Sequence, residues 1–185
     1  MRRINILLVT ILSLFSFSVE AQEKFYTKTG KISFFSVAPL ENIEATHKSA
    51  VALLDTKTGD MQFAVLMKGF EFKKALMQEH FNNSYIESDK YPKGEFKGQL
   101  VNSGSVDYSN DGIYNVKVKG QLTIHGVTKD AEATGTLTVK EGKIIAYSVF
   151  NILLADYNIT IPKMYQDNIS KTVKITVNCT LDPLK

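Results

Sequence analysis

The chain is poor in the residue types that build covalent cross-links and metal sites. Its 185 residues include one cysteine, Cys179, and three histidines, His47, His80 and His125. A single cysteine excludes an internal disulfide, so stability has to come from packing and strand pairing. No two histidines have the i, i+4 spacing of a helical metal site, and no Cys–His or His–Glu pattern replaces it. We therefore expect neither a metal nor another cofactor.

The sequence also lacks the groupings that support nucleophilic catalysis. Cys179 alternates with Val177 and Leu181 on an apolar face, which predicts a buried small side chain and not a nucleophile. His125 and Asp156 are the one conceivable acid–base pair, but no serine elbow or glycine-rich turn accompanies them. We expect a protein that binds its ligand without covalent chemistry. A hydrolase or isomerase that uses His125 or Asp156 is the alternative.

Only one long apolar run is present, and it stands at the start of the chain. A short basic segment precedes an apolar stretch over residues 4–19, and small residues then occupy the two positions that signal peptidase reads. This pattern predicts a signal peptide over residues 1–21, cleaved between Ala21 and Gln22. The protein would then be periplasmic or secreted, with a single domain over residues 22–185. A membrane anchor is the alternative, although the run is short for a spanning helix.

An excess of charge of one sign is also missing. Without residues 1–21 the chain keeps 20 Lys and Arg residues against 18 Asp and Glu residues, a net charge of +2. No basic stripe stands out along the sequence. Nucleic acid is therefore a poor partner for this chain.

Alternation of apolar and polar residues fills most of the mature chain and is typical of strands with one buried face. It predicts strands over residues 32–37, 43–54, 61–68, 114–125, 130–139, 143–155 and 172–181. About eight antiparallel strands at short spacing indicate an all-β fold, an eight-stranded antiparallel β-barrel with one short helix. A barrel of this size is either filled by its own side chains or holds one small ligand.

The segment from Phe72 to Phe81 breaks the alternation and is rich in helix formers. Phe72, Leu76 and His80 stand at i, i+4 and i+8, with Met77 and Phe81 beside them, which predicts a short amphipathic helix. A helix that caps a barrel lies near its mouth. Among the histidines, His80 is therefore the best candidate for contact with the polar head of a ligand.

Alternation alone does not tell which face of the barrel is apolar. A small outer-membrane barrel has a similar length and export signal, with its apolar face outside. Three features favour a soluble barrel: the small side chains of Ala131, Ala133 and Gly135, the helical insertion, and a C-terminus without an aromatic residue. The outer-membrane barrel remains the main alternative. A barrel plugged by its own phenylalanines, acting as a stress-related interaction module, is another.

The strand predicted over residues 143–155 is apolar on both faces. One face is expected to point into the barrel, and the other carries Ile145, Tyr147, Val149 and Leu153. Outward apolar side chains need cover from a loop, a terminal segment or a second subunit. A homodimer contact through this face is one hypothesis.

Two separate stretches combine turn, aromatic and proline positions in a specific way. The first is Leu76-Met77-x-x-His80-Phe81 followed by Tyr85-Ile86-Glu87-Ser88-x-Lys90-Tyr91-Pro92-x-x-x-Phe96, and the second is Gly120-x-Leu122-Thr123-Ile124-x-Gly126-Val127-Thr128-Lys129. With Asp156-Tyr157-x-Ile159 near the end, their order and spacing resemble the YceI-like family across nearly the whole mature chain. Proteins of that family are periplasmic lipocalin-like barrels that hold polyisoprenoid lipids.

The resemblance implies an extended lipocalin-like barrel with an isoprenoid chain threaded through an apolar lumen. The expected partner is an isoprenoid, a quinone or another long-chain lipid, which the protein carries or sequesters without stable membrane insertion. Burial of apolar carbon contributes about 0.8 kcal/mol per methylene, so a long tail binds without an ion pair. Bulky members of the inward faces and of the helix are expected to contact the ligand, and His80, Tyr91 and Tyr157 are the candidates for its polar mouth. The full set is Phe34, Phe63, Val65, Met77, His80, Phe81, Tyr91, Val118, Leu122, Phe150, Leu154 and Tyr157.

Overall fold

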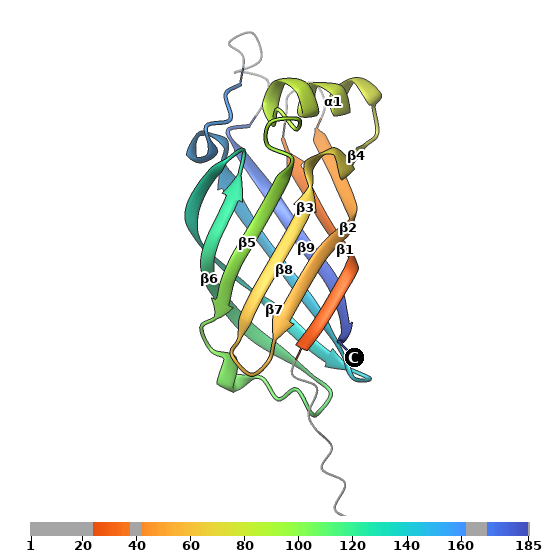
Figure 1. Ribbon diagram of the computed structural model, residues 1–185, viewed down its shortest axis with the longest axis vertical. Helices are drawn as coiled ribbons and strands as arrows, with labels where there is room; N and C mark the ends of the chain where they lie inside the picture. The colour runs from red at the N-terminus through yellow and green to blue at the C-terminus, as the bar shows by residue number, and fades with distance from the viewer. Residues whose placement is uncertain (1–23, 38–41, 162–169, 185) are drawn as a thin grey trace, which may run out of the picture.

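Eight long antiparallel strands form the wall of a closed barrel in the computed structural model, which describes residues 24–37, 42–161 and 170–184 (Figure 1). The predicted eight-stranded antiparallel barrel with one short helix is therefore confirmed. A two-residue strand, β4 (Glu71–Phe72), adds to the edge of one long strand. The long strands are β1 (Lys24–Ser36), β2 (Ile43–Asp55), β3 (Asp60–Leu66), β5 (Lys93–Leu100), β6 (Gly112–Ile124), β7 (Val127–Lys140), β8 (Lys143–Leu153) and β9 (Thr172–Pro183).

Pairing of the first two strands closes the sheet. The strand order is β1-β9-β8-β7-β6-β5-β3-β2, and β1 pairs with β2 in turn. Closure removes the open edge through which long alternating strands would otherwise aggregate. Two of the hairpins turn through two residues that both have positive φ, His125-Gly126 between β6 and β7 and Glu141-Gly142 between β7 and β8. Such turns match the twist of the flanking strands.

Helical segments gather at one end of the barrel, where α1 lies across the top in Figure 1. They are η1 (Met67–Gly69), α1 (Ala75–His80), the π-helical turn η2 (Phe81–Tyr85) and η4 (Leu154–Tyr157). A further short helix, η3 (Ser103–Ser105), lies at the opposite end of the barrel, next to Gly59 in the β2–β3 turn. The predicted start of the helix at Phe72 is wrong by three residues, because the backbone of Phe72 pairs with Ala45 on β2 as part of β4. The helix continues through η2 to Tyr85, four residues beyond the predicted end.

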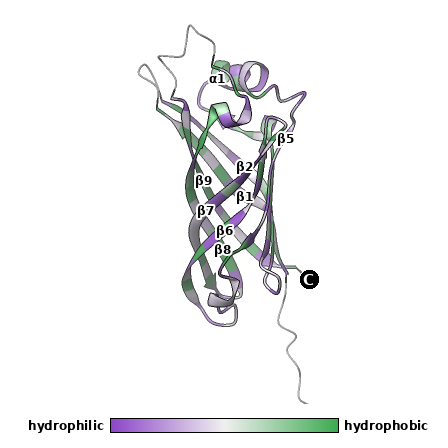
Figure 2. Ribbon diagram, turned by 90° about the vertical axis from the view of Figure 1, so that its left-hand side faces the viewer, coloured by the Kyte–Doolittle hydropathy of each residue, from purple (hydrophilic) through white to green (hydrophobic). Residues whose placement is uncertain are grey.

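Buried side chains form two clusters along the barrel axis. The lower cluster, at the end opposite α1, includes Leu54, Leu137, Ile144, Cys179 and Leu181, and each of these five side chains is at most 1% exposed. The upper cluster, below the helical segments, is built around Met67, Phe70, Ile86, Tyr157 and Ile159. Hydrophilic and hydrophobic residues are interspersed along the strands, as the alternation predicts (Figure 2).

The outer face of β8 departs from the alternation of buried apolar and exposed polar residues. Tyr147, Val149 and Leu153 are 46%, 42% and 49% exposed. The described parts of the chain thus supply no cover for them, although a loop or terminal segment is one of the covers expected from the sequence. Among the described residues there is no helix with both the length and the apolar character needed to cross a bilayer. The predicted signal peptide, residues 1–21, lies outside the described residues.

Removal of a side chain from the lower cluster tests how much this packing contributes to stability. Leu54 is 0% exposed and Leu76, on α1, is 62% exposed. We expect Leu54→Ala to lower the free energy of unfolding by about 2–5 kcal/mol, because it leaves a cavity in a close-packed region. The matched change Leu76→Ala should stay within about 0.5 kcal/mol of the wild type. Urea denaturation of both variants measures the difference, and equal losses would contradict a packed lower cluster.

Candidate functional site

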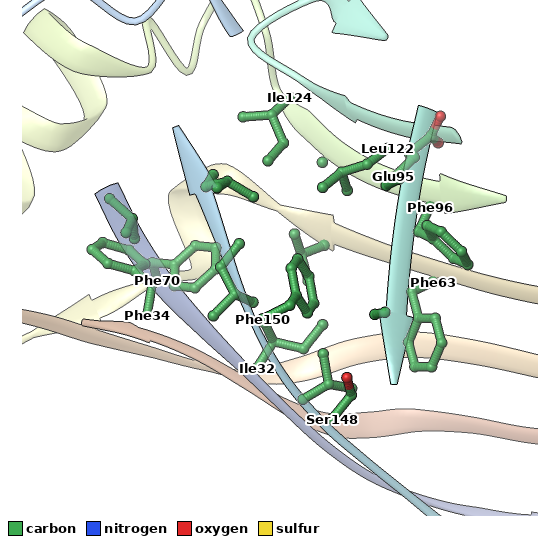
Figure 3. A pocket seen from close by; sticks show the side chains of 18 of the residues that line it. Ile32, Phe34, Phe63, Phe70, Glu95, Phe96, Leu122, Ile124, Ser148 and Phe150 are labelled. Carbon is green, nitrogen blue, oxygen red and sulfur yellow. The ribbon is translucent and has the colours of Figure 1, made fainter. Parts of the chain in front are cut away.

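A cavity of about 480 Å³ occupies the barrel between the lower cluster and the helical segments. This volume lies within the range of about 300–1,000 Å³ that is usual for small-molecule sites. Its wall is almost wholly apolar, and Phe34, Phe63, Phe96 and Phe150 project into it from four different strands (Figure 3). The arrangement favours a ligand that is itself apolar over most of its surface.

Small side chains on β7 make room for the cavity. Ala131, Ala133 and Gly135 form the inner face of this strand over the upper half of the barrel, and all three line the cavity. Below them the same face changes to Leu137 and Val139, which are buried in the lower cluster. Since eight strands enclose only enough space for side chains or one small ligand, the change from large to small residues along β7 sets where the packed part ends and the lumen begins.

Four phenylalanine rings close the lumen from above. The ring of Phe34 on β1 has centroid distances of 5.4 Å to Phe70, 5.7 Å to Phe72 and 5.4 Å to Phe81. Tilted and stacked contacts at such distances add to the energy of burial. They attach β4 and η2 to the barrel wall, so the helical segments form a lid that is packed onto aromatic side chains.

The two stretches that carry the family resemblance meet at the rim of the barrel. His125, in the β6–β7 turn, lies 3.0 Å from a carboxylate oxygen of Glu87 through Nε2 and 3.1 Å from the carbonyl oxygen of Tyr157 through Nδ1. Its ring packs edge-on against Tyr91, with centroids 4.3 Å apart. A Cβ on Gly126 would lie 2.5 Å from the Tyr91 ring, so a larger residue does not fit here. These contacts join the lid, the turn and η4.

The expected ligand residues fall into two groups. Ten of them line the cavity: Phe34, Phe63, Val65, Met77, His80, Phe81, Val118, Leu122, Phe150 and Leu154. Tyr91 and Tyr157 lie outside the lining. Tyr91 is turned toward His125, and Tyr157 is buried in the upper cluster, where burial raises the pKa of its hydroxyl. The structure does not bring these two tyrosines to the cavity wall, since both pack within the rim.

Several lining residues are absent from the sequence-based set, among them Ile32, Phe70 and Phe96. Phe96 lies on β5 and pairs with Phe63 on β3. Alternation predicts no strand there, because Gly94 and Gly98 replace the apolar residues that would mark its inner face. The pairing of β5 with β6 appears only in the structure.

Chemistry other than binding finds little support in the described residues. No group of three or more His, Cys, Asp or Glu residues in this part of the chain could hold a metal ion. Burial raises the pKa of Cys179 to about 11, which keeps its thiol neutral, as expected of a buried small side chain. His125 is bonded to Glu87 and to the backbone of Tyr157, while Asp156 is exposed.

Comparison with known proteins decides the family. The family model described as the YceI-like domain matches residues 12–181. The chain belongs to the YceI-like family. None of the curated proteins compared with the chain matches it.

Solved structures of the family share the barrel. A polyisoprenoid binding domain from Saccharophagus degradans implicated in plant cell wall breakdown has a TM-score of 0.76 at 13% identity, covering 88% of this chain and 99% of its own. Burkholderia cenocepacia BcnA has a TM-score of 0.67 at 16% identity and coverages of 82% and 95%. The YCEI protein of Campylobacter jejuni has a TM-score of 0.57 at 18% identity, and the match covers 74% of this chain and 81% of its own. At these identities the likeness establishes the fold.

His47 on β2 is a buried titratable group in the wall beside the lid. It is 3% exposed and packs against Phe70, with ring centroids 5.3 Å apart. Its Nδ1 accepts the backbone N–H of Ser49 at 3.1 Å, which requires that this nitrogen carry no proton. Burial lowers the pKa of His47 below 6.5, although a hydrogen bond with the Leu66 backbone and the charge of Glu71 act in the opposite direction.

The lowered pKa of His47 predicts a loss of stability in acid. Near pH 6.5 the unfolded chain takes up a proton that the folded chain accepts only at lower pH, so this group lowers the free energy of unfolding as pH falls below 6.5. We expect His47→Gln to flatten the decline between about pH 7 and about pH 5. The control His80→Gln, at an exposed position of α1, should keep the wild-type decline. Urea titrations across this pH range test both, and an unchanged decline in His47→Gln rejects the assignment.

Proposed function

We propose that the protein holds a polyisoprenoid or a similar long-chain amphiphile in the barrel lumen, for carriage or sequestration outside the cytoplasm after export. The observation that carries the proposal is the cavity of about 480 Å³, whose wall is apolar from the lower cluster to the lid. The quinones and other long-chain lipids expected from the sequence share the apolar tail. The neighbour from Saccharophagus degradans, described as polyisoprenoid-binding, supports this class of ligand.

The energetics of burial support a ligand with a long tail. Each methylene removed from water contributes about 0.8 kcal/mol, so ten buried carbons supply roughly 8 kcal/mol before the costs of ordering the ligand and of association. The lining offers few polar partners, with Glu95, Glu132, His80 and Ser148 among them. Affinity therefore comes from the tail, and the polar head adds little.

The outer surface supports a barrel surrounded by water. The outward face of β6 and β7 carries Lys117 and Lys119, which both form ion pairs with Glu132 at 2.5 and 2.7 Å. An outer-membrane barrel has an apolar band on this side. The alternation with apolar residues inside thus favours a soluble carrier over the outer-membrane alternative.

Two further alternatives receive less support. The cavity stays open although Phe34, Phe63 and Phe150 project into it, which argues against a barrel filled by its own side chains. A hydrolase or isomerase based on His125 would need this ring free to act on a substrate. Both of its nitrogens face acceptors within the rim, which favours a structural role, so we propose binding without covalent chemistry.

Native mass spectrometry of protein purified from its own host identifies the class of ligand. We expect a co-purified lipid with a long apolar tail, released by organic extraction and identified by its mass. The bare protein, combined with no uptake of added polyprenol or fatty acid, would falsify the proposal. Release of the protein from cells without detergent tests the exported, soluble state in the same preparation.

A charge placed in the lumen should abolish uptake. Leu122 on β6 is buried and lines the cavity, and its neighbour Gln121 is exposed on the outer face of the same strand. We expect Leu122→Asp to weaken binding of the fluorescent fatty acid cis-parinaric acid at least tenfold, because a carboxylate in an apolar wall is costly to desolvate. Gln121→Asp adds the same group outside and should bind as the wild type does. Fluorescence titration measures both, and undiminished binding by a folded Leu122→Asp variant removes this residue from the site.

A further inference from the structure

The ladder between β7 and β8 stops part-way up the barrel. On their other sides both strands are paired to the top, β7 with β6 through thirteen pairs and β8 with β9 through ten. Between themselves they form six pairs, which end at Gly135 and Ser148. Residues 127–134 of β7 and 149–153 of β8 therefore face one another as two strand edges that are not joined by a ladder.

The end of the ladder is built from specific contacts. A Cβ on Gly135 would collide with the carbonyl oxygen of Tyr147 and lie 3.0 Å from Cβ of Ser148, so the strands approach closely at their last pair. Just beyond it, Ser148 Oγ donates a hydrogen bond of 2.8 Å to the carbonyl oxygen of Thr134. This carbonyl is the first on β7 without a ladder partner on β8. The side chain of Ser148 replaces the backbone donor that a continued ladder would have supplied.

The cavity reaches the edges of this gap. On β6 and β9 its lining takes alternate residues, such as Val116 and Val118 or Ile175 and Val177, as expected of a wall that shows one face. On β7 it takes every residue from Ala131 to Leu137, a longer consecutive run than 63–65 on β3 or 94–96 on β5. Both faces of β7 line the cavity here, which places the strand edge itself at its border. The lumen is thus continuous with the outer surface between β7 and β8.

The described residues pack one end of the barrel and cover much of the other. The lower cluster packs the first end, and the phenylalanine rings and helical segments lie over the second. At its upper limit the gap is bounded by η4, because Leu154 and Ile159 pack in the same cluster as Val127 and Ala131. The gap is therefore a side window between η4 and the Gly135–Ser148 pair.

The two strand edges that border this window differ in the polarity of their outward residues. On β8 this edge carries exposed Val149 and Leu153, and exposed Tyr147 lies just below it in the ladder. On β7 the outward residues are polar, among them Thr134 and Glu132. A lipid tail that leaves the lumen meets apolar side chains on one edge. Contact with such a tail gives the apolar outer face of β8 a role.

We propose that the gap between β7 and β8 is a lateral portal through which a long-chain lipid enters and leaves the lumen, with any excess length of the tail lying along the outer face of β8. This inference rests on the proposed lipid-binding function. The portal adds a route for the lipid into and out of the lumen. It also explains how the protein can bind lipid chains that are longer than the lumen.

A covalent bridge across the gap tests the portal. Continued from Gly135 and Ser148, the register places Glu132 of β7 opposite Asn151 of β8, and both residues are exposed. The double variant Glu132→Cys/Asn151→Cys is bridged with a bis-maleimide. The matched control is Thr138→Cys/Ile145→Cys, an outward pair within the ladder, bridged in the same way. Cys179 is buried with a pKa of about 11, so the reagent leaves it unmodified.

Stopped-flow fluorescence with cis-parinaric acid gives the result. We expect the bridged portal variant to take up the probe at least tenfold more slowly than its unbridged form, and the bridged control to match the wild type. Wild-type uptake together with an unchanged rate in the bridged portal variant overturns the portal and leaves the lipid-binding function standing. No uptake by the wild type overturns both. If the double variant does not fold, Asn151→Cys with a bulky maleimide adduct is compared with Ile145→Cys carrying the same adduct.

Discussion

The volume of the inward side chains decides whether this barrel is solid or hollow. Closure of the sheet through β1 and β2 fixes the circumference, so the interior can gain space only if some inward side chains are small. Over the upper half of β7 those side chains are two alanines and a glycine, and over the lower half they are Leu137 and Val139. The lower half is therefore filled by buried side chains that stabilise the fold, while the upper half leaves space for a ligand.

Sequence alone predicts the parts of this architecture in which alternation is uninterrupted. Val116, Leu122 and Ile124 of β6 all lie inward, as the period of two requires. The prediction is weakest where another constraint overrides the period. On β5 glycines occupy inward positions, so no apolar face is visible. At Phe72 helical spacing competes with β-pairing to Ala45, and the ring is held by Phe34 and Phe81. Tertiary contacts of this kind leave no mark on the local pattern.

In the candidate site, too, some residues are predicted by alternation and others are placed by tertiary contacts. Bulky inward residues of clear strands, such as Phe63 and Leu122, line the lumen as alternation predicts. The tyrosines assigned to a polar mouth do not, because Tyr91 and Tyr157 are held in the rim through His125. The segments that carry the family resemblance therefore serve two purposes, because Met77, Phe81 and Leu122 line the lumen while Tyr91 and Tyr157 hold the rim together. Resemblance in a motif indicates a structural constraint, and which constraint it is becomes visible only in three dimensions.

β8 carries apolar residues on both faces, and this feature bears most directly on how a lipid tail reaches the lumen. β8 is paired with β9 along its length, but with β7 only up to Ser148. Above that point its edge is free of β7, and its outward side chains border an opening into the lumen. An apolar outer face beside a fully closed wall would only favour aggregation. Beside an interrupted wall it extends the apolar surface of the lumen to the outside, so interior and exterior form one continuous path for a lipid tail.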